Sequence, residues 1–424
     1  MSQPQMHPPK KPRALYILPA IVAVILCILP LVGVLAPRLL GFLPAAMGLL
    51  SLPVFRIITG HWPALSKFYL ITAIATVSLA ALSSLWAFDS AFALERSGKI
   101  ALVLFGGVAL FTLMRTPEIC WPHWLGWVFP LCFLGSALLA LSELITHGLI
   151  HYSWRGSDVP LMSTNVSITN RAVVLLCLLC PPTLMLLSRA TLLARTKNVL
   201  FTLIVIAMIG ILALTDSQSA HLAVLTTALF WFGFPLARPK AWIVLGALII
   251  AGILSSPWLA QILYNTLASH MKGISWFAQA YAADRLEIWD FVARKALESP
   301  FYGFGIEATR HVEHFDTPML YTPLDHVLHP HNAVLQIWIE FGALGALGLS
   351  IFVAAMMQVL YRATQLCADK TAARLLLSIF MAALVVSCTA YGFWQGWWLG
   401  LLTLLGALCV HIIKPHGTAD AVSQ

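Results

Sequence analysis

Long apolar segments recur along almost the whole chain, and they constrain its fold more than any other feature. Twelve of them come close to the roughly 20 residues that a helix needs to cross a bilayer. They cover residues 14–36, 39–58, 67–87, 98–114, 121–145, 172–189, 197–214, 219–236, 241–264, 333–361, 373–393 and 395–413. The sequence therefore predicts an all-α, polytopic membrane protein with about 12 transmembrane helices.

The overall composition agrees with this prediction. Of the 424 residues, 60% are hydrophobic and only 10% are charged, whereas a soluble protein carries about 25% charged residues. So few charges cannot cover a series of soluble domains, and we exclude that architecture. The net charge of +8 is not taken as a nucleic-acid signal, because most basic residues flank the apolar segments.

The basic residues also predict how the chain crosses the membrane. Cytoplasmic loops are enriched in Lys and Arg. If both termini lie in the cytoplasm, 15 of the 25 basic residues fall on short cytoplasmic segments. The predicted layout is a basic cytoplasmic tail (1–13), nine transmembrane helices (14–264), one large external loop (265–332), three further transmembrane helices (333–413) and a second cytoplasmic tail (414–424).

The large external loop concentrates the polar residues of the chain. Eight of the 17 acidic residues lie between Asp284 and Asp325, and five of the 14 histidines lie between His311 and His331. Any polar chemistry is therefore expected here. Residues 284–299 have an apolar stripe at helical spacing and are followed by Pro300, which predicts a helix on the membrane surface or on the tops of the membrane helices.

The polar residues of this predicted helix have two interpretations each. Asp284, Glu287 and Asp290 share one face and could act as paired carboxylates in glycosidic chemistry, but we expect a solvated helix face. Arg285 can stack on Trp289 and hold its planar guanidinium toward a phosphate. The alternative for Arg285 is a side chain that reaches to the lipid headgroups.

The histidines of the loop suggest a base rather than a metal site. Their spacing fits no helical zinc motif and no cysteine is near, so we predict no metal. His331 stands where the loop meets the next helix, and an imidazole there can act as a base near neutral pH. The alternative is that His331 and Asn332 only cap the helix.

Three polar residues follow one face of that helix into the membrane. Asn332, Gln336 and Glu340 are spaced four residues apart. Polar side chains inside a bilayer are costly and face a cavity or a polar partner. We therefore expect a groove along this face, with His331 at its mouth.

Basic residues of other external segments could complete a cationic pocket. Arg155 and Arg171 lie in the external segment 146–171, and Arg96 and Lys99 lie at the predicted start of the fourth membrane helix. Loop salt bridges are the alternative role of each. Together with Arg285, these residues would form a pocket at the outer headgroup plane, for which a lipid phosphate or diphosphate is the natural ligand.

A set of these residues resembles the signature of the O-antigen ligase and polymerase superfamily. The set comprises Arg285 and Trp289, Gly303-x-Gly305, His331-Asn332 at a helix start, Gly342 and Gly345. Twelve helices with one large periplasmic loop before the tenth resemble the ligase branch. The resemblance implies a membrane-embedded glycosyltransferase fold of the C type, in the cell inner membrane, with the active site facing the periplasm.

The resemblance also implies a reaction and roles for the candidate residues. Such ligases transfer O-antigen polysaccharide from undecaprenyl diphosphate to a sugar hydroxyl of the lipid A–core oligosaccharide, with inversion and without a metal or other cofactor. No nucleic acid and no protein partner are implied. His331 would be the base, and Asn332 would orient His331 or the acceptor sugar. Arg155, Arg171 and Arg285, with Arg96 and Lys99 as second choices, would bind the diphosphate, and Trp289 and Gln336 would line the substrate groove.

The chain departs from the family pattern in one place, and other functions stay open. Many members carry Thr-x-Ser-Arg where this chain has Thr215-Asp216-Ser217-Gln218, so one cation is missing. The alternatives are an O-antigen polymerase, which the unequal external loops disfavour, a protein O-oligosaccharyltransferase, and a lipid or sugar transporter. A transporter would place charged or helix-breaking residues near the middle of the bilayer.

Overall fold

The structure is a computed structural model that describes residues 14–154, 169–274, 278, 281–312, 320–321 and 327–413. All regular secondary structure of these residues is helical, and they include no β-strand. The predicted all-α class is therefore confirmed. The two predicted tails and Arg155 lie outside the described residues.

The twelve predicted apolar segments each lie on a helix of their own. The helices are α1 (Ala14–Leu35), η1 (Pro37–Gly41), α2 (Leu43–Thr59), α3 (Lys67–Ser83), α4 (Ser90–Arg115), α5 (Leu125–Ile145), α6 (Leu149–Trp154), α7 (Asn170–Ser188), α8 (Ala194–Leu214), α9 (Gln218–Gly233), α10 (Pro239–Lys272), α12 (Ala282–Glu298), η4 (Ala308–Arg310), α13 (Ala333–Leu366), α14 (Lys370–Ser387) and α15 (Gly396–Ile413).

Ten helical segments of the described chain are long and apolar enough to cross a membrane. The two helices that fall short are α3, with 17 residues, and α9, with 16 residues. The chain is thus a multi-pass membrane protein, while the number of twelve spans stays a prediction. α10 continues to Lys272, beyond the predicted end at residue 264, and α4 begins at Ser90, before the predicted start at residue 98.

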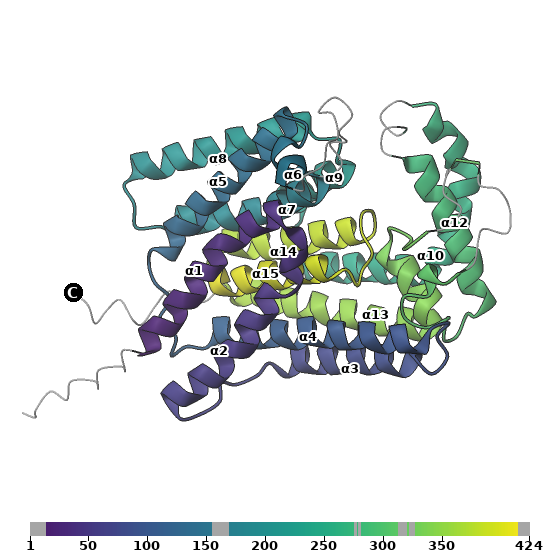
Figure 1. Cartoon of the computed structure of the whole chain (residues 1–424), viewed down its shortest axis with the longest axis horizontal. Helices are drawn as coiled ribbons and strands as arrows, with labels where there is room; N and C mark the ends of the chain where they lie inside the picture. Colours follow the sequence, from purple (N-terminus) through teal and green to yellow (C-terminus); the bar gives the residue numbers. More distant parts are fainter. Residues whose placement is uncertain are drawn as a thin grey trace, which may run out of the picture.

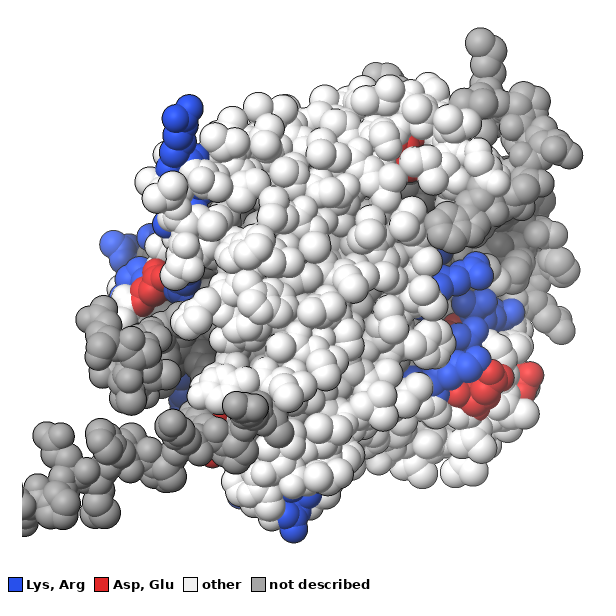
Figure 2. All heavy atoms as spheres, turned by 60° about the vertical axis from the view of Figure 1, so that its left-hand side comes forward, with Lys and Arg blue, Asp and Glu red and all other residues white. Residues whose placement is uncertain are grey.

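Most of the long helices run side by side, and α12 crosses one end of them (Figure 1). The face shown in Figure 2 has a broad belt with almost no charged residues, and its Lys, Arg, Asp and Glu gather toward two opposite ends. This distribution is what a bilayer requires, because charged side chains are costly in hydrocarbon.

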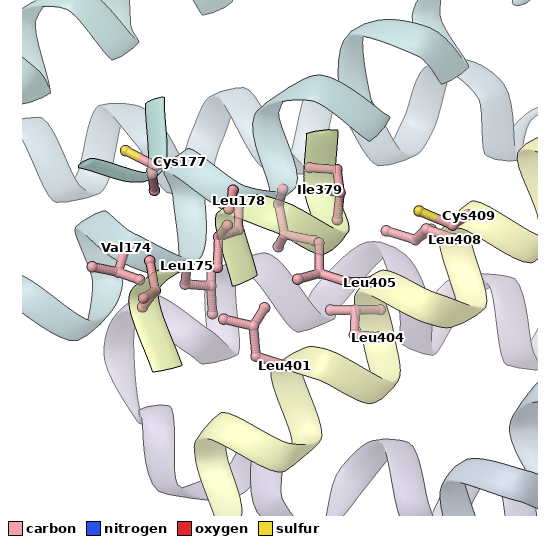
Figure 3. Close-up of a cluster of buried hydrophobic side chains, with 14 of the residues drawn as sticks. Val174, Leu175, Cys177, Leu178, Ile379, Leu401, Leu404, Leu405, Leu408 and Cys409 are labelled. Atoms are coloured by element: carbon pink, nitrogen blue, oxygen red, sulfur yellow. The ribbon is translucent and has the colours of Figure 1, made fainter. Parts of the chain in front are cut away.

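The centre of the molecule is a close packing of aliphatic side chains from α7, α14 and α15 (Figure 3). Leu175 and Leu178 of α7 and Leu401 and Leu404 of α15 are fully buried. Lipid tails are as apolar as leucine, so helix association in a membrane depends on such van der Waals contact. This central packing holds the polar ends of α7, α14 and α15 in fixed relative positions.

Segments predicted to lie on the cytoplasmic side meet at one end of the molecule. The Arg189 guanidinium donates to the Ile412 carbonyl and, at 2.5 Å, to the Asp369 carboxylate. The Arg374 guanidinium donates to the Trp231 carbonyl at 2.6 Å. These contacts join segments that were predicted to lie on the same side of the membrane. The assignment of this end to the cytoplasm stays a prediction.

α13 contains a break at Gly342 that the loop 300–305 fills. Gly342 has φ +58°, ψ −148°, which is not helical. The amides of Ala343 and Leu344 donate to the carbonyls of Pro300 and Phe301 at 2.7 and 3.1 Å. In return the amides of Phe304 and Gly305 donate to carbonyls of α13 before the break, both at 2.9 Å. The loop thus satisfies backbone groups that a broken membrane helix would leave unpaired.

The glycines of the family signature make this close approach possible. A Cβ atom on Gly303 would lie 2.4 Å from the carbonyl carbon of Glu340, and one on Gly342 would lie 2.6 Å from that of Phe301. Both glycines also have a positive φ, which other residues rarely adopt. The role of the Gly303-x-Gly305 pair in this structure is therefore backbone packing.

α12 confirms the helix predicted over residues 284–299 and corrects the prediction for its acidic face. Its apolar stripe packs against α10 and α13. Glu287 and Asp290 are only 3% and 4% exposed, so the expected solvated face is wrong for both. The carboxylate of Glu287 accepts from the amides of Leu320 and Tyr321 at 2.6 and 2.8 Å, because the external loop folds over this side of the helix.

Candidate functional site

The turn between α14 and α15, residues 388–395, binds three of the candidate site residues. The Arg285 Nη1 group donates to the Thr389 carbonyl at 2.8 Å. The His331 Nδ1 atom lies 2.6 Å from the Ala390 carbonyl oxygen. The amide of Phe393 donates to the Gln336 Oε1 atom at 2.8 Å. Residues of α12 and of the start of α13 thus converge on a turn that the sequence predicts to lie in membrane helices.

His331 is held in a state that can accept a proton. Because a carbonyl oxygen only accepts, the Nδ1 atom of His331 must carry the hydrogen, which leaves the lone pair on Nε2. Nε2 makes no hydrogen bond with a described residue. The backbone of His331 has φ +53°, a costly conformation of the kind that clusters at active sites. The ring is therefore oriented by its surroundings rather than by local preference.

The surroundings of His331 also keep it neutral. Burial, the neighbouring His329 and the charge of Arg285 lower the pKa of His331 to about 4, against a smaller opposing effect of the Ala390 hydrogen bond. The ring centres of His329 and His331 lie 4.3 Å apart with perpendicular planes. Above this pKa the Nε2 lone pair of His331 is available to a substrate hydroxyl.

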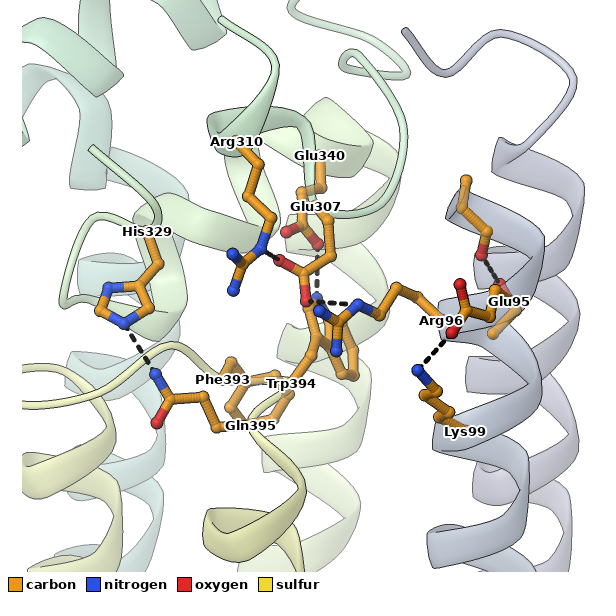
Figure 4. Close-up of polar contacts among 12 residues, drawn as sticks. Glu95, Arg96, Lys99, Glu307, Arg310, His329, Glu340, Phe393, Trp394 and Gln395 are labelled. Atoms are coloured by element: carbon orange, nitrogen blue, oxygen red, sulfur yellow. Dashed lines mark hydrogen bonds and ion pairs between the residues drawn. The ribbon is translucent and has the colours of Figure 1, made fainter. Parts of the chain in front are cut away.

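His329 is fixed by a short chain of side-chain hydrogen bonds. The Trp397 Nε1 group donates to Gln395 Oε1 at 2.7 Å, so the amide nitrogen of Gln395 must donate to His329 Nε2, which lies 2.7 Å away (Figure 4). His329 therefore carries its hydrogen on Nδ1. Gly392 leaves room for this ring, because a Cβ atom there would lie 2.5 Å from His329 Cδ2.

Two of the five predicted diphosphate ligands, Arg171 and Arg285, lie near one tyrosine. Burial raises the pKa of Tyr391, and the nearby positive charges of Arg171 and Arg285 oppose that rise. The Arg171 guanidinium lies 5.7 Å from the ring centre of Trp397 and makes no hydrogen bond with a described residue. We call Arg171, Arg285, His331 and Tyr391 the Tyr391 cluster; it has free guanidinium donors beside a free imidazole acceptor.

Arg96 and Lys99 do not join this cluster, so the structure divides the predicted single cationic pocket. Lys99 pairs with Glu95 on the exposed side of α4. Arg96 lies with its Nε atom 3.7 Å from the carboxylate of Glu307, which also accepts from Arg310 Nε at 2.6 Å (Figure 4). The physical reason is that α4 begins at Ser90, so both cations lie further along the helix than predicted and find carboxylates there.

Trp289 and Asn332 have structural partners. The expected stacking of Arg285 on Trp289 does not occur among the described cation–π contacts. Instead Trp289 Nε1 donates to the carbonyl of Pro330 at 2.8 Å, which fixes the residue before His331. Asn332 Oδ1 accepts from the amides of Val334 and Leu335 at 3.0 and 3.2 Å, which makes it the N-cap of α13.

Gln336 and Glu340 face protein rather than the expected groove. They are 2% and 0% exposed. The Gln336 amide donates to Glu340 Oε1 at 2.9 Å, and Trp394 Nε1 donates to Glu340 Oε2 at 2.5 Å. The prediction that Gln336 lines a substrate groove is therefore wrong, because its face of α13 is covered by the turn 388–395. The polar side chains hold that turn on α13.

The sequence analysis missed the turn 388–395 and the charged residues Glu307 and Arg310. The turn does carry a local signal: Tyr391, Trp394 and Gln395 stand between two unusually short apolar segments. Among the described residues there is no group of three or more potential metal ligands, and His314 and His326 of the external loop lie outside them.

Comparison with known protein families gives a match to the central part of the chain. Residues 203–350 match the model of the O-antigen ligase family. The chain carries an O-antigen ligase family domain. This domain includes α12, the break in α13 and the residues Arg285, Trp289 and His331. The resemblance predicted from the sequence is therefore confirmed at the level of the family.

Curated proteins from Rickettsia are similar to about half of this chain. A Rickettsia conorii protein named "Putative polysaccharide ligase" is 27% identical over 222 residues, which are 51% of this chain and 52% of that protein. A Rickettsia prowazekii protein of the same description is 27% identical over 230 residues, 53% of this chain and 54% of that protein. The chain thus spans about half the length of the curated relatives that it matches.

The candidate site extends beyond the matched O-antigen ligase domain. Arg171 on α7, the turn 388–395 and Arg96 on α4 all lie outside residues 203–350. The domain supplies His331 and Arg285, and the turn between α14 and α15 supplies the carbonyls that bind them. The site therefore depends on the packing of the whole helical bundle.

Proposed function

We propose that this protein transfers O-antigen polysaccharide from undecaprenyl diphosphate to a sugar hydroxyl of the lipid A–core oligosaccharide in lipopolysaccharide biosynthesis. It would act as a C-type glycosyltransferase of the cell inner membrane, with its site facing the periplasm. One observation supports this function most strongly. The bond between His331 and the Ala390 carbonyl leaves the Nε2 lone pair of His331 free beside Arg285.

In the proposed reaction the acceptor hydroxyl attacks the anomeric carbon of the lipid-linked sugar. His331 Nε2 takes the proton of that hydroxyl as the new C–O bond forms. The bond to the diphosphate oxygen breaks on the opposite face, so the configuration inverts and the diphosphate leaves with the electron pair. No metal is required in this scheme, because guanidinium groups stabilise the developing negative charge.

Arg171 and Arg285 are the proposed diphosphate ligands within the described residues. Both lie near Tyr391, and neither pairs with a carboxylate of a described residue. Arg155, which lies outside the described residues, would join them from the external segment 146–171. Trp289 and Asn332 would act indirectly, since they fix the backbone on either side of His331.

An apolar cavity below Arg171 supports a lipid-linked donor. It has a volume of about 190 Å³ and is lined by side chains of α7, α8 and α9, among them Cys177, Met208 and Leu212. Cys177 is six residues after Arg171 on α7, which at 1.5 Å per residue is roughly 9 Å. Part of an isoprenoid tail could therefore enter the cavity while its diphosphate reaches Arg171.

Deleting the gene and analysing the glycolipids tests this function. Long polysaccharide retained on undecaprenyl diphosphate, with lipid A–core left bare, is the expected result. Lipid A–core that carries single repeat units would instead indicate an O-antigen polymerase. Loss of glycan from glycoproteins, with normal lipopolysaccharide, would indicate a protein O-oligosaccharyltransferase. Transfer by the purified protein in detergent would exclude a transporter, which has no activity without two compartments.

A further inference from the structure

A second group of charged and polar side chains surrounds Glu307 at the same end of the molecule. Glu307 is 5% exposed and has φ +59°. Arg96 from α4 and Arg310 from η4 both approach its carboxylate. The Arg96 guanidinium also lies 4.8 Å from the ring centre of Phe92, and the His311 ring meets the same phenyl ring edge-on at 5.3 Å. We call Arg96, Glu307, Thr309, Arg310 and His311 the Glu307 cluster.

Three buried polar atoms of the Glu307 cluster make no hydrogen bond within the part of the chain that the structure describes. They are Arg96 Nε, Thr309 Oγ1 and His311 Nε2. Thr309 is only 4% exposed, so solvent does not satisfy its hydroxyl. Buried polar groups in native proteins are almost always paired, and the exceptions often mark a ligand or ion that the protein binds. Three such atoms on adjoining residues therefore indicate a place for a polar ligand.

The charge of the cluster indicates that this ligand is an anion. Two guanidinium groups share one carboxylate, so the three side chains have a net charge of +1 (two positive charges and one negative). The side chains of Arg96 and Arg310 are 29% and 25% exposed, and their terminal nitrogens make no hydrogen bond with a described residue. Arginine binds phosphate oxygens through such planar, paired donors.

The Glu307 cluster and the Tyr391 cluster both approach His329. Burial and then the charges of Arg310 and Arg171 lower the pKa of His329, so one arginine of each cluster is within electrostatic reach of this ring. Figure 4 shows His329 with Gln395, then Arg310 and Glu307, and then Arg96 across the view. His329 is thus within electrostatic reach of two separate sets of arginines.

We propose that the Glu307 cluster binds a phosphate monoester on the acceptor glycolipid. The proposal rests on the proposed function, in which the attacking and leaving oxygens lie on opposite sides of the anomeric carbon. If the Tyr391 cluster holds the leaving diphosphate, the acceptor approaches His331 from the side opposite the diphosphate, and the Glu307 cluster supplies a second set of arginines within reach of the neighbouring His329. A phosphate there would fix the acceptor sugar with its hydroxyl toward His331.

The test is a transfer assay with two acceptors and the full-length protein in nanodiscs of phosphatidylcholine. The acceptors are a synthetic lipid-linked oligosaccharide with one phosphate monoester and the same molecule without it. For Arg310→Gln we expect the KM of the phosphorylated acceptor to rise about tenfold, the scale of one charge-assisted hydrogen bond. The KM values of the neutral acceptor and of the donor should not change. Arg96→Gln should act in the same direction, and Arg310→Lys should recover part of the loss.

Arg38→Gln is the matched control. Arg38 is exposed and has no ion pair with a described residue. Arg38 belongs to η1, which lies close to the start of α15, since a Cβ atom on Gly41 would lie 2.9 Å from the backbone of Gly396. The Arg38→Gln substitution therefore removes one charge from the same end of the molecule. Its KM values should equal those of the wild type with both acceptors.

Four outcomes would overturn the proposal. They are an equal rise in KM for both acceptors, a rise in the donor KM, no change in any KM, and a difference that appears only when anionic lipid is added to the nanodiscs. If the wild type transfers nothing, the proposed function fails, but the inference is still tested by binding. The wild type should then bind the phosphorylated acceptor about tenfold more tightly than the neutral one, and Arg310→Gln should abolish that preference; equal binding would overturn it.

Discussion

At the end of the molecule that contains Arg189 and Arg374, cations are used to close the ends of helices. Arg189 binds a carboxylate and the last turn of α15, and Arg374 binds the carbonyl of Trp231. At the opposite end, Arg171 makes only an aromatic contact among the described residues, and Arg285 donates one hydrogen bond. Arg189, which binds a carboxylate and a helix end, stabilises the fold, whereas Arg171 and Arg285 pair with no carboxylate of a described residue and keep donors available to an anionic ligand.

Among the substitutions that test this difference between the two ends, the change at His331 should have the largest effect on transfer. We predict that His331→Ala lowers the transfer rate by about 10²–10⁴-fold, the usual contribution of a general base. The protein should still insert into membranes at the wild-type level. The rate is measured with purified protein and lipid-linked donor, and a variant with full activity would exclude His331 as the base.

Replacing Arg285 should have the next largest effect. We predict that Arg285→Lys lowers kcat by about 10²-fold, because one ammonium group cannot both bind the Thr389 carbonyl and present a planar fork to the diphosphate. Arg294→Lys is a suitable control, since Arg294 is on the same helix and pairs with Asp290. Equal losses in the two variants would assign Arg285 to the fold rather than to the diphosphate.

A smaller effect, which depends on pH, should follow from Gln395→Glu. The carboxylate would accept a hydrogen from His329 Nε2, so His329 would become protonated at a higher pH than in the wild type. A cation would then stand beside His331, between the charges of Arg171 and Arg310, and would disfavour its protonation in the transition state.

We therefore predict that kcat of Gln395→Glu falls about tenfold as the pH is lowered from 8 to 5.5, because His329 passes through a pKa near or above the ordinary histidine value of about 6.5. The wild type should be flat over this range, since the pKa of His331 is about 4. A pH–rate profile of both proteins is the measurement. Parallel profiles would mean that His329 does not influence His331.

The smallest expected effect on transfer is at the other end of the molecule. Arg189→Gln should lower stability by about 1 kcal/mol, because its partly exposed ion pair with Asp369 is screened by solvent. Both KM values and kcat should remain at the wild-type level. Thermal unfolding in detergent and the transfer assay test the two statements, and an altered KM would remove the distinction between the two ends.

The features that the sequence predicted are those encoded by local spacing. Apolar runs located the long helices, the stripe of residues 284–299 located α12, and the junction at His331 located the candidate base. The structure adds contacts between residues far apart in the chain. Ala390 orients His331 from 59 positions away, and neither residue type indicates that pairing by itself.

The predictions that the structure corrects failed for the same reason, which is that contacts between distant residues leave no local pattern. Glu287 is buried because residues 320–321 fold over it, and a helical pattern does not report what covers a polar face. Gln336 seemed suited to a groove because its partner, the amide of Phe393, belongs to a segment that resembles a membrane helix. The break in α13 was also missed, since the apolar run continues through Gly342 without a proline.

The break at Gly342 divides α13 into two helical segments with different roles. Residues 343–366, at 1.5 Å per residue, extend roughly 36 Å, which is enough to cross a hydrocarbon core of about 30 Å. Residues 333–341 add about 14 Å that the crossing does not need. Residues 333–341 can therefore extend above the hydrocarbon, where the loop 300–305 binds them through backbone hydrogen bonds. His331 lies just before the first residue of this segment. A change in bilayer thickness would tilt the span, while His331 would keep its height above the hydrocarbon.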